Sequence, residues 1–214
     1  MSNLTLFIGD KNLSSWSLRP WLMLKQTGIP FTEKLIPLDK PETKGAILEK
    51  SPSGLVPCLV DGPAVVWDSL AIAEYLAETF PDAGLWPDDR LARAHARSSA
   101  AEMHSGFGEL RKVWPMNFSR VGMRHLCPTG VRRDVERIAA IWMEARKRFG
   151  AGGPFLYGRF SIADAMYAPV VSRFMTYGPV DLPAEAAQYR DMMFDLPAMQ
   201  EWGEAAADEV SGKN

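Results

Sequence analysis

The chain has 214 residues, a formal net charge of −2 at pH 7 and 47% hydrophobic residues, so it is long and apolar enough to bury a sizeable core. Lysine and arginine are spread along the sequence, which argues against nucleic acid as a partner. No stretch approaches the ~18 uninterrupted apolar residues of a membrane span, and residues 1–10 lack a charged and apolar leader, so we expect a cytoplasmic protein away from the membrane.

Residues 1–80 alternate between strand-like and helix-like patterns. Short apolar or alternating runs predict strands, and longer periodic runs between them predict helices. In chain order the prediction is a strand, a helix, a strand, a short helix, two strands and a helix, at residues 4–8, 18–26, 32–38, 44–49, 56–60, 64–67 and 69–79. The order βαβ(α)ββα is that of a thioredoxin-like domain with a mixed four-stranded sheet.

The pattern becomes helical after a Pro-rich connector at residues 81–87. No strand-like alternation of comparable strength follows it. The fold class is therefore α/β plus all-α, with one domain at residues 1–80 and an all-helical domain at residues 88–214. The helices predicted in the second domain cover residues 91–110, 131–149, 162–175 and 198–208.

Cysteine and histidine are few and scattered. Cys58 and Cys127 lie far apart and form no C-x-x-C motif. His95, His104 and His125 form no ligand cluster. We therefore expect neither a disulfide framework nor a metal site.

A cluster of serines precedes the first predicted helix. Pro20 has no N–H group, so it is tolerated most easily near the start of a helix, where N–H groups lack an internal partner. With Ser17 as N-cap, Pro20 falls at the third helical position. Ser14 or Ser15 would then lie in the preceding turn, free to point a hydroxyl at a ligand, and Ser14 is the preferred candidate. The alternative is that all three serines are turn and cap residues.

A second motif surrounds the strand that Val56-Pro57 introduces. A proline is unusual at the mouth of an apolar strand and X-Pro is the usual place for a cis bond, so we predict that Val56–Pro57 is cis. The helix that follows opens with Asp68 and Ser69. N–H groups at a helix start can hold an anionic ligand group, although an acid and a hydroxyl there can equally be simple caps.

These motifs, in their order and spacing, resemble the glutathione S-transferase family over nearly the whole chain. The segment Ser-Ser-Trp-Ser-Leu-Arg at residues 14–19 is similar to the Ser-Ser-Cys-Ser-x-Arg signature of zeta-like, serine-type members. The Val-Pro pair and the Asp-Ser pair match the family's cis-proline and helix-start positions. Residues 160–164 look like the capping segment of the family's helical half, and we interpret Ser161 and Asp164 as a folding element.

The resemblance implies a glutathione-binding first domain. A serine hydroxyl, Ser14 or Ser15, would stabilise the glutathione thiolate, which is the nucleophilic form of a thiol. No cysteine lies in residues 10–19, which disfavours a dithiol redox role. Glutathione is the implied co-substrate, without a metal, and its expected binding residues are Val56, Pro57, Asp68, Ser69, Lys44 and Lys50.

The helical half would hold an apolar electrophile. An apolar strip at helical spacing offers a pocket wall beside the thiol, although most such strips are core. The expected pocket residues are Met103, Phe107, Arg111 and Trp114.

The resemblance leaves the reaction open. A glutathione S-transferase is the preferred interpretation, and the family implies a homodimer. A zeta-like maleylacetoacetate isomerase is an alternative, against which Trp16 counts because it replaces the signature cysteine. A non-catalytic transferase-like interaction module is another, but it would have no need of the serine, Val-Pro and Asp-Ser motifs together. The sequence does not identify the electrophile.

Overall fold

A computed structural model describes residues 4–123 and 126–212, so His125 lies outside the described residues. The first part of the chain forms one mixed sheet of four strands, in the order β2–β1–β3–β4. β1 pairs with β2 in parallel and with β3 antiparallel, and β3 pairs antiparallel with β4. The strands are β1 (Leu4–Ile8), β2 (Phe31–Leu35), β3 (Cys58–Asp61) and β4 (Ala64–Val66).

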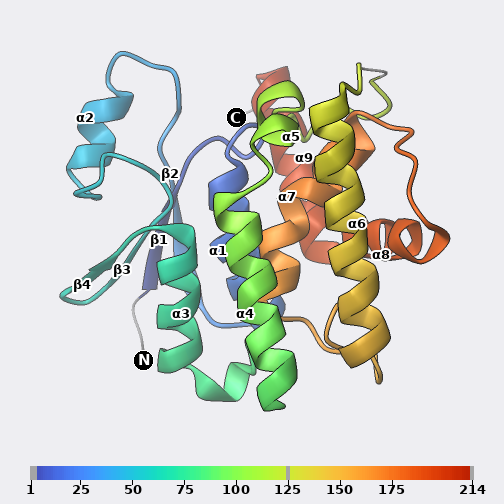
Figure 1. Cartoon of the computed structure of the whole chain (residues 1–214). Helices are drawn as coiled ribbons and strands as arrows, with labels where there is room; N and C mark the ends of the chain where they lie inside the picture. The colour runs from blue at the N-terminus through green and yellow to red at the C-terminus, as the bar shows by residue number, and fades with distance from the viewer. Residues whose placement is uncertain (1–3, 124–125, 213–214) are drawn as a thin grey trace.

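Three helices accompany the sheet: α1 (Ser15–Thr27), α2 (Thr43–Leu48) and α3 (Ser69–Thr79). Figure 1 shows α1 and α3 between the sheet and the helices of the second half, with α2 on the outer side. Alternate residues of β1 are fully buried, as the strand periodicity of two requires. The thioredoxin-like arrangement predicted from the sequence is confirmed.

The second half of the chain is helical throughout. Its centre is a helix of which every residue except Met175 is buried, because it packs against helices on several sides, α1 of the first half among them. After a short 3-10 turn at Pro81–Ala83, the helices are α4 (Arg90–Ser105), α5 (Gly108–Val113), α6 (Thr129–Phe149), the central α7 (Ile162–Thr176), α8 (Ala184–Phe194) and α9 (Pro197–Ser211). None of the described helices is long and apolar enough to cross a membrane.

Two features of the helical half differ from the sequence prediction. The helix predicted at residues 91–110 is broken into α4 and α5, because Phe107 adopts a left-handed backbone conformation with φ of 58°. The helix α8 was missed. Only Ala186, Tyr189 and Met193 of α8 are buried, so its apolar pattern is too sparse to stand out in the sequence.

The start of α7 contains the predicted folding element. The buried carboxylate of Asp164 accepts hydrogen bonds from the N–H and the hydroxyl of Ser161 at 2.9 and 2.8 Å. It also accepts from the N–H of Leu156 at 3.0 Å and from the hydroxyl of Tyr189 at 2.9 Å. Asp164 therefore ties the helix start to the loop before it and to α8.

Candidate functional site

One cavity brings the two predicted binding motifs together. It has a volume of about 260 Å³ and lies where β3 and α3 begin. It is lined by Trp16, Ser53, Leu55, Val56, Pro57, Trp67, Asp68 and Ser69. The Val-Pro and Asp-Ser pairs thus face one space, and Trp16 adds a wall from α1.

The Val56–Pro57 bond is cis, as predicted. Both residues precede the β-ladder, because the first pair in register between β1 and β3 joins Phe7 with Cys58. The main chain at Val56 therefore lies at the cavity outside the sheet's own pairing.

Asp68 is the N-cap of α3. One of its carboxylate oxygens accepts a hydrogen bond from the N–H of Leu70 at 2.8 Å. The other lies 3.4 Å from Nε2 of His104, and 48% of the side chain is exposed. The capping role foreseen as the alternative is real, but the half-exposed carboxylate still faces the cavity, where a ligand's ammonium group could meet it.

The predicted arrangement of the serines is wrong in one respect. The N-cap of α1 is Ser14, not Ser17, so Pro20 lies well inside the helix. The Ser14 hydroxyl donates to Oγ of Ser17 at 2.7 Å, and Ser17 also accepts from the N–H of Gly9 at 3.1 Å. With 7% exposure, Ser14 is not the free hydroxyl that we expected. Ser15, at the first helical position, is partly exposed.

Trp16 lies within a group of cationic and titratable side chains that the sequence analysis missed. The guanidinium of Arg19 lies 4.2 Å from the centre of the indole, and that of Arg111 lies 4.9 Å from it. The ring of His104 meets the indole edge-on at 5.3 Å. Only the (i, i+3) spacing of Trp16 and Arg19 was visible in the sequence as a sign of this contact.

The guanidinium of Arg19 is buried with few hydrogen-bond acceptors. Only 1% of the residue is exposed, its Nε atom has no partner among the described residues, and its contact with Oγ of Ser69 is long at 3.5 Å. Burial, followed by repulsion from Arg111 and Arg173, lowers the pKa of Arg19 well below its ordinary value of 12.5, although Asp68 opposes this. Arg19 and Arg111 therefore bring two guanidinium groups close to Trp16, and burial disfavours the charged form of Arg19.

The remaining predicted residues are placed differently. Met103 is fully buried and Phe107 is 7% exposed, so both belong to the hydrophobic core and not to an open pocket wall. Trp114 is also buried, and it lines a separate cavity of about 450 Å³ beside Tyr177. The guanidinium of Arg111, a further expected pocket residue, contacts the indole of Trp16. The apolar strip is core, as the alternative reading held.

Lys44 and Lys50 are exposed, and neither lines the cavity beside Val56. Within residues 4–123 and 126–212, no group of three or more His, Cys, Asp and Glu side chains is arranged to hold a metal ion.

His104 links Asp68 to this cationic group, and its protonation should affect stability. Burial lowers the pKa of His104 below its ordinary value of 6.5; Asp68 opposes the change, while Arg19 and Arg111 add to it. The unfolded chain then binds more protons than the folded one as the pH falls below 6.5, so the folded state loses stability. We expect the unfolding free energy of the wild type to fall relative to His104→Gln between about pH 7 and about pH 5, measured by urea denaturation. Parallel pH profiles would contradict this prediction.

Known proteins with similar sequences point to one family. The N-terminal domain of glutathione S-transferases matches residues 13–79, and the C-terminal domain matches residues 128–202. The chain is 38% identical over 99 residues to a probable maleylacetoacetate isomerase of Caenorhabditis elegans, covering 46% of this chain and 45% of that protein. It is 36% identical over 108 residues to glutathione S-transferase 1 of Dianthus caryophyllus, covering 50% and 49%. The matches thus span about half the length of these curated relatives.

Solved structures agree on the fold. A glutathione transferase homolog from Burkholderia gl BGR1, with bound glutathione, superposes with a TM-score of 0.70 at 23% identity, covering 96% of this chain and 98% of that one. At this identity the likeness establishes the fold alone. The family assignment comes from the two domain matches, which occur in the expected order; the first of them includes both predicted binding motifs that line the cavity. The chain belongs to the glutathione S-transferase family.

Proposed function

We propose that the protein is a glutathione S-transferase that binds glutathione in the cavity beside Val56 and activates its thiol. The observation that carries the proposal is that the Val56-Pro57 and Asp68-Ser69 pairs, distant in the sequence, line one cavity next to the start of α1. A domain division at residues 81–87, a homodimer and a cytoplasmic location complete the proposal.

Each end of glutathione has a proposed partner. The main chain of Val56, ahead of Pro57, would pair with the cysteinyl unit. Asp68 would meet the γ-glutamyl ammonium, and Ser69, at the first position of α3, would accompany its carboxylate at the helix N-terminus. The exposed lysines Lys44 and Lys50 would approach the glycine carboxylate from α2 and the residues after it.

A hydroxyl of the serine turn, the segment that contains Ser14 and Ser15 at the start of α1, would activate the thiol. A hydroxyl stabilises a thiolate only by donating its proton, and the Ser14 hydroxyl donates to Ser17. Ser15 is therefore the better donor, with Ser14 as the second candidate. Lowering a thiol pKa by ~2 units requires about 2.7 kcal/mol, which one charge-assisted hydrogen bond and a helix N-terminus can supply.

The isomerase remains a second candidate because of the cationic group around Trp16. Maleylacetoacetate carries two carboxylates, and the buried guanidinium of Arg19 has few acceptors of its own. Arg111, whose guanidinium also contacts the indole of Trp16, adds a second cation. An anionic substrate would find these charges favourable, whereas an apolar electrophile would gain little from them. Turnover of an apolar electrophile would favour the transferase, and turnover of maleylacetoacetate would favour the isomerase.

Binding and thiol activation can be tested without knowing the second substrate. We expect bound glutathione to show thiolate ultraviolet absorbance well below the ordinary pKa of a thiol, ~8.5 to 9. Asp68→Ala should weaken binding at least about tenfold, because it removes the charge that meets the ammonium, while leaving the thiolate titration in place. No binding at millimolar glutathione would overturn the transferase proposal. Binding without a shifted titration would favour an interaction module.

A further inference from the structure

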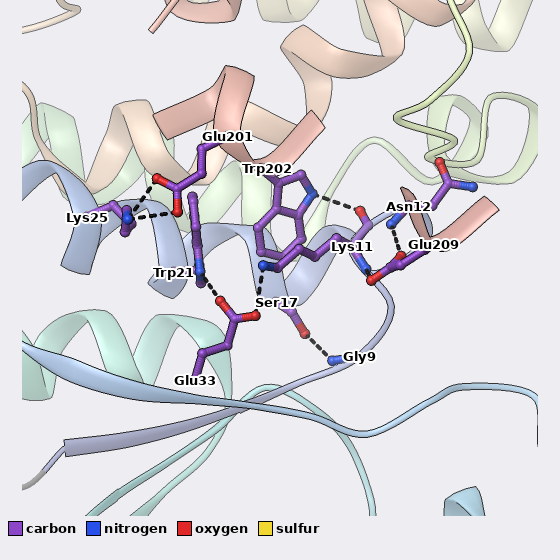
Figure 2. Close-up of polar contacts among 10 residues, drawn as sticks. All are labelled: Gly9, Lys11, Asn12, Ser17, Trp21, Lys25, Glu33, Glu201, Trp202 and Glu209. Carbon is purple, nitrogen blue, oxygen red and sulfur yellow. Dashed lines mark hydrogen bonds and ion pairs between the residues drawn. The ribbon is translucent and has the colours of Figure 1, made fainter. Parts of the chain in front are cut away.

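The two residues that precede the serine turn are held by the helical half of the molecule. The N–H groups of Lys11 and Asn12 donate to the two carboxylate oxygens of Glu209, at 2.9 and 3.0 Å. The carbonyl of Lys11 accepts from Nε1 of Trp202 at 2.7 Å. Figure 2 shows these contacts, in which two residues of the last helix, α9, clasp the loop after β1.

The segment between α5 and α6 also forms hydrogen bonds with this loop. The carbonyl of Asn12 accepts from the N–H of Phe118 at 3.1 Å, and its side-chain oxygen accepts from the N–H of Ser119 at 2.8 Å. All four main-chain polar groups of Lys11 and Asn12 are therefore paired with the second half of the chain. The main-chain conformation at these two residues therefore depends on the helical half as well as on the thioredoxin-like half.

Contacts of the Lys11 side chain also restrain the position of its backbone. Its ammonium lies 2.7 Å from a carboxylate oxygen of Glu33, and 5.4 and 5.5 Å from the ring centres of Trp21 and Trp202. Glu33 also accepts from Nε1 of Trp21 at 2.6 Å. Figure 2 shows the ammonium of Lys11 close to both indoles and to Glu33. Displacing the Lys11 backbone would break this whole set of contacts.

Main-chain hydrogen bonds connect this loop to the serines at the start of α1. The carbonyl of Asp10 accepts from the N–H of Leu13 at 3.2 Å and from that of Ser14 at 2.8 Å, so residues 10–14 form one continuous turn into α1. A shift at Lys11 or Asn12 would therefore move the start of α1, where Ser14 and Ser15 lie. A misplacement of about 1 Å in a catalytic group can cost ~100-fold in rate.

We propose that Glu209 is a positioning residue for thiol activation: its carboxylate fixes the loop that sets the serine turn. The inference rests on the proposed function, since it assigns Glu209 a part in that reaction. A carboxylate suits the task because both of its oxygens accept, and each meets one N–H of two consecutive residues. Glu209 acts through the backbone, without touching the substrate.

Glu209→Gln is the test variant, because an amide offers one acceptor and places an NH₂ group against a backbone N–H. Glu201→Gln is the matched control: Glu201 lies on the same helix and pairs with Lys25 of α1 at 2.7 Å, away from the loop. For Glu209→Gln we expect kcat with a generic electrophile to fall about tenfold, glutathione KM to stay within about twofold, and the thiolate titration to move toward that of free glutathione. Glu201→Gln should change none of these.

The outcomes separate the inference from the function on which it rests. Wild-type protein without glutathione binding would overturn the proposed function. A wild type that works, with Glu209→Gln equal to Glu201→Gln in kcat and titration, would overturn the positioning role. A fall in kcat that comes only with an equal loss of glutathione affinity would also overturn it, because general loosening would explain that result. Amide hydrogen exchange should be faster at Lys11 and Asn12 in Glu209→Gln alone, and unchanged exchange would count against the inference whether or not glutathione binds.

Discussion

Replacing Asp164 with alanine is expected to lower the free energy of unfolding by about 3–5 kcal/mol, the largest stability loss that we expect from a single polar side chain. The buried carboxylate accepts from two N–H groups and two hydroxyls, those of Leu156, Ser161 and Tyr189. Alanine would leave these donors unpaired, and each buried unpaired donor costs about 1–3 kcal/mol. Urea denaturation at neutral pH, with the linear dependence on denaturant, measures the loss.

Two comparisons make this prediction specific. Ser161→Ala removes one hydroxyl donor and should cost much less, about 1 kcal/mol. Burial raises the pKa of Asp164 to about 6, above its ordinary value of 3.8. The folded state therefore retains a proton that the unfolded chain releases, and the stability that Asp164 contributes should fall as the pH rises from 3.8 to about 6. The role assigned to Asp164 would be contradicted if Asp164→Ala lowered the free energy of unfolding less than Ser161→Ala. It would also be contradicted if the loss caused by Asp164→Ala grew as the pH rises from 3.8 to about 6.

Local patterns were enough to predict much of the fold. The short apolar run of β1 and the acid-hydroxyl start of α3 gave the bounds of both elements, because each depends on neighbours in the sequence. The meeting of Val56-Pro57 with Asp68-Ser69 was also foreseen, since a strand entrance and the following helix start lie close in a small β-β-α unit. The capping element at Ser161 and Asp164 follows from its own spacing.

Contacts over long sequence distances could not be predicted in the same way. Ser17 has the same local features as an N-cap, but its hydroxyl accepts from Gly9, and the helix starts earlier. The neighbours of Trp16 come from three helices, with Arg19 on α1, His104 on α4 and Arg111 on α5. Arg111 follows the break between α4 and α5 at Phe107, which the sequence pattern did not predict. In both cases tertiary packing decides between local arrangements that the sequence leaves nearly equal.

Ser15→Ala is expected to reduce turnover with a generic electrophile at least about tenfold while changing glutathione affinity much less, because a donor to the thiolate matters more for reaction than for binding. Loss of one charge-assisted hydrogen bond, worth about 1.5–3 kcal/mol, corresponds to at least a tenfold fall in the thiolate's stability relative to the thiol. Steady-state kinetics give the turnover, and the ultraviolet titration of bound glutathione gives the thiol pKa.

Ser14→Ala and Ser15→Thr are the controls that distinguish the two hydroxyls. Ser14 already donates to Ser17, so its removal frees an acceptor inside the protein and takes no donor from the ligand. We therefore expect Ser14→Ala to leave the thiol pKa close to that of the wild type, and Ser15→Thr, which keeps a hydroxyl at the first position of α1, to restore most of the turnover. A large effect of Ser14→Ala with none of Ser15→Ala would require the Ser14 hydroxyl to turn from Ser17 to the thiolate when glutathione binds. Ser14, the candidate preferred from the sequence, would then be the catalytic donor, although it is the N-cap of α1 and does not precede it.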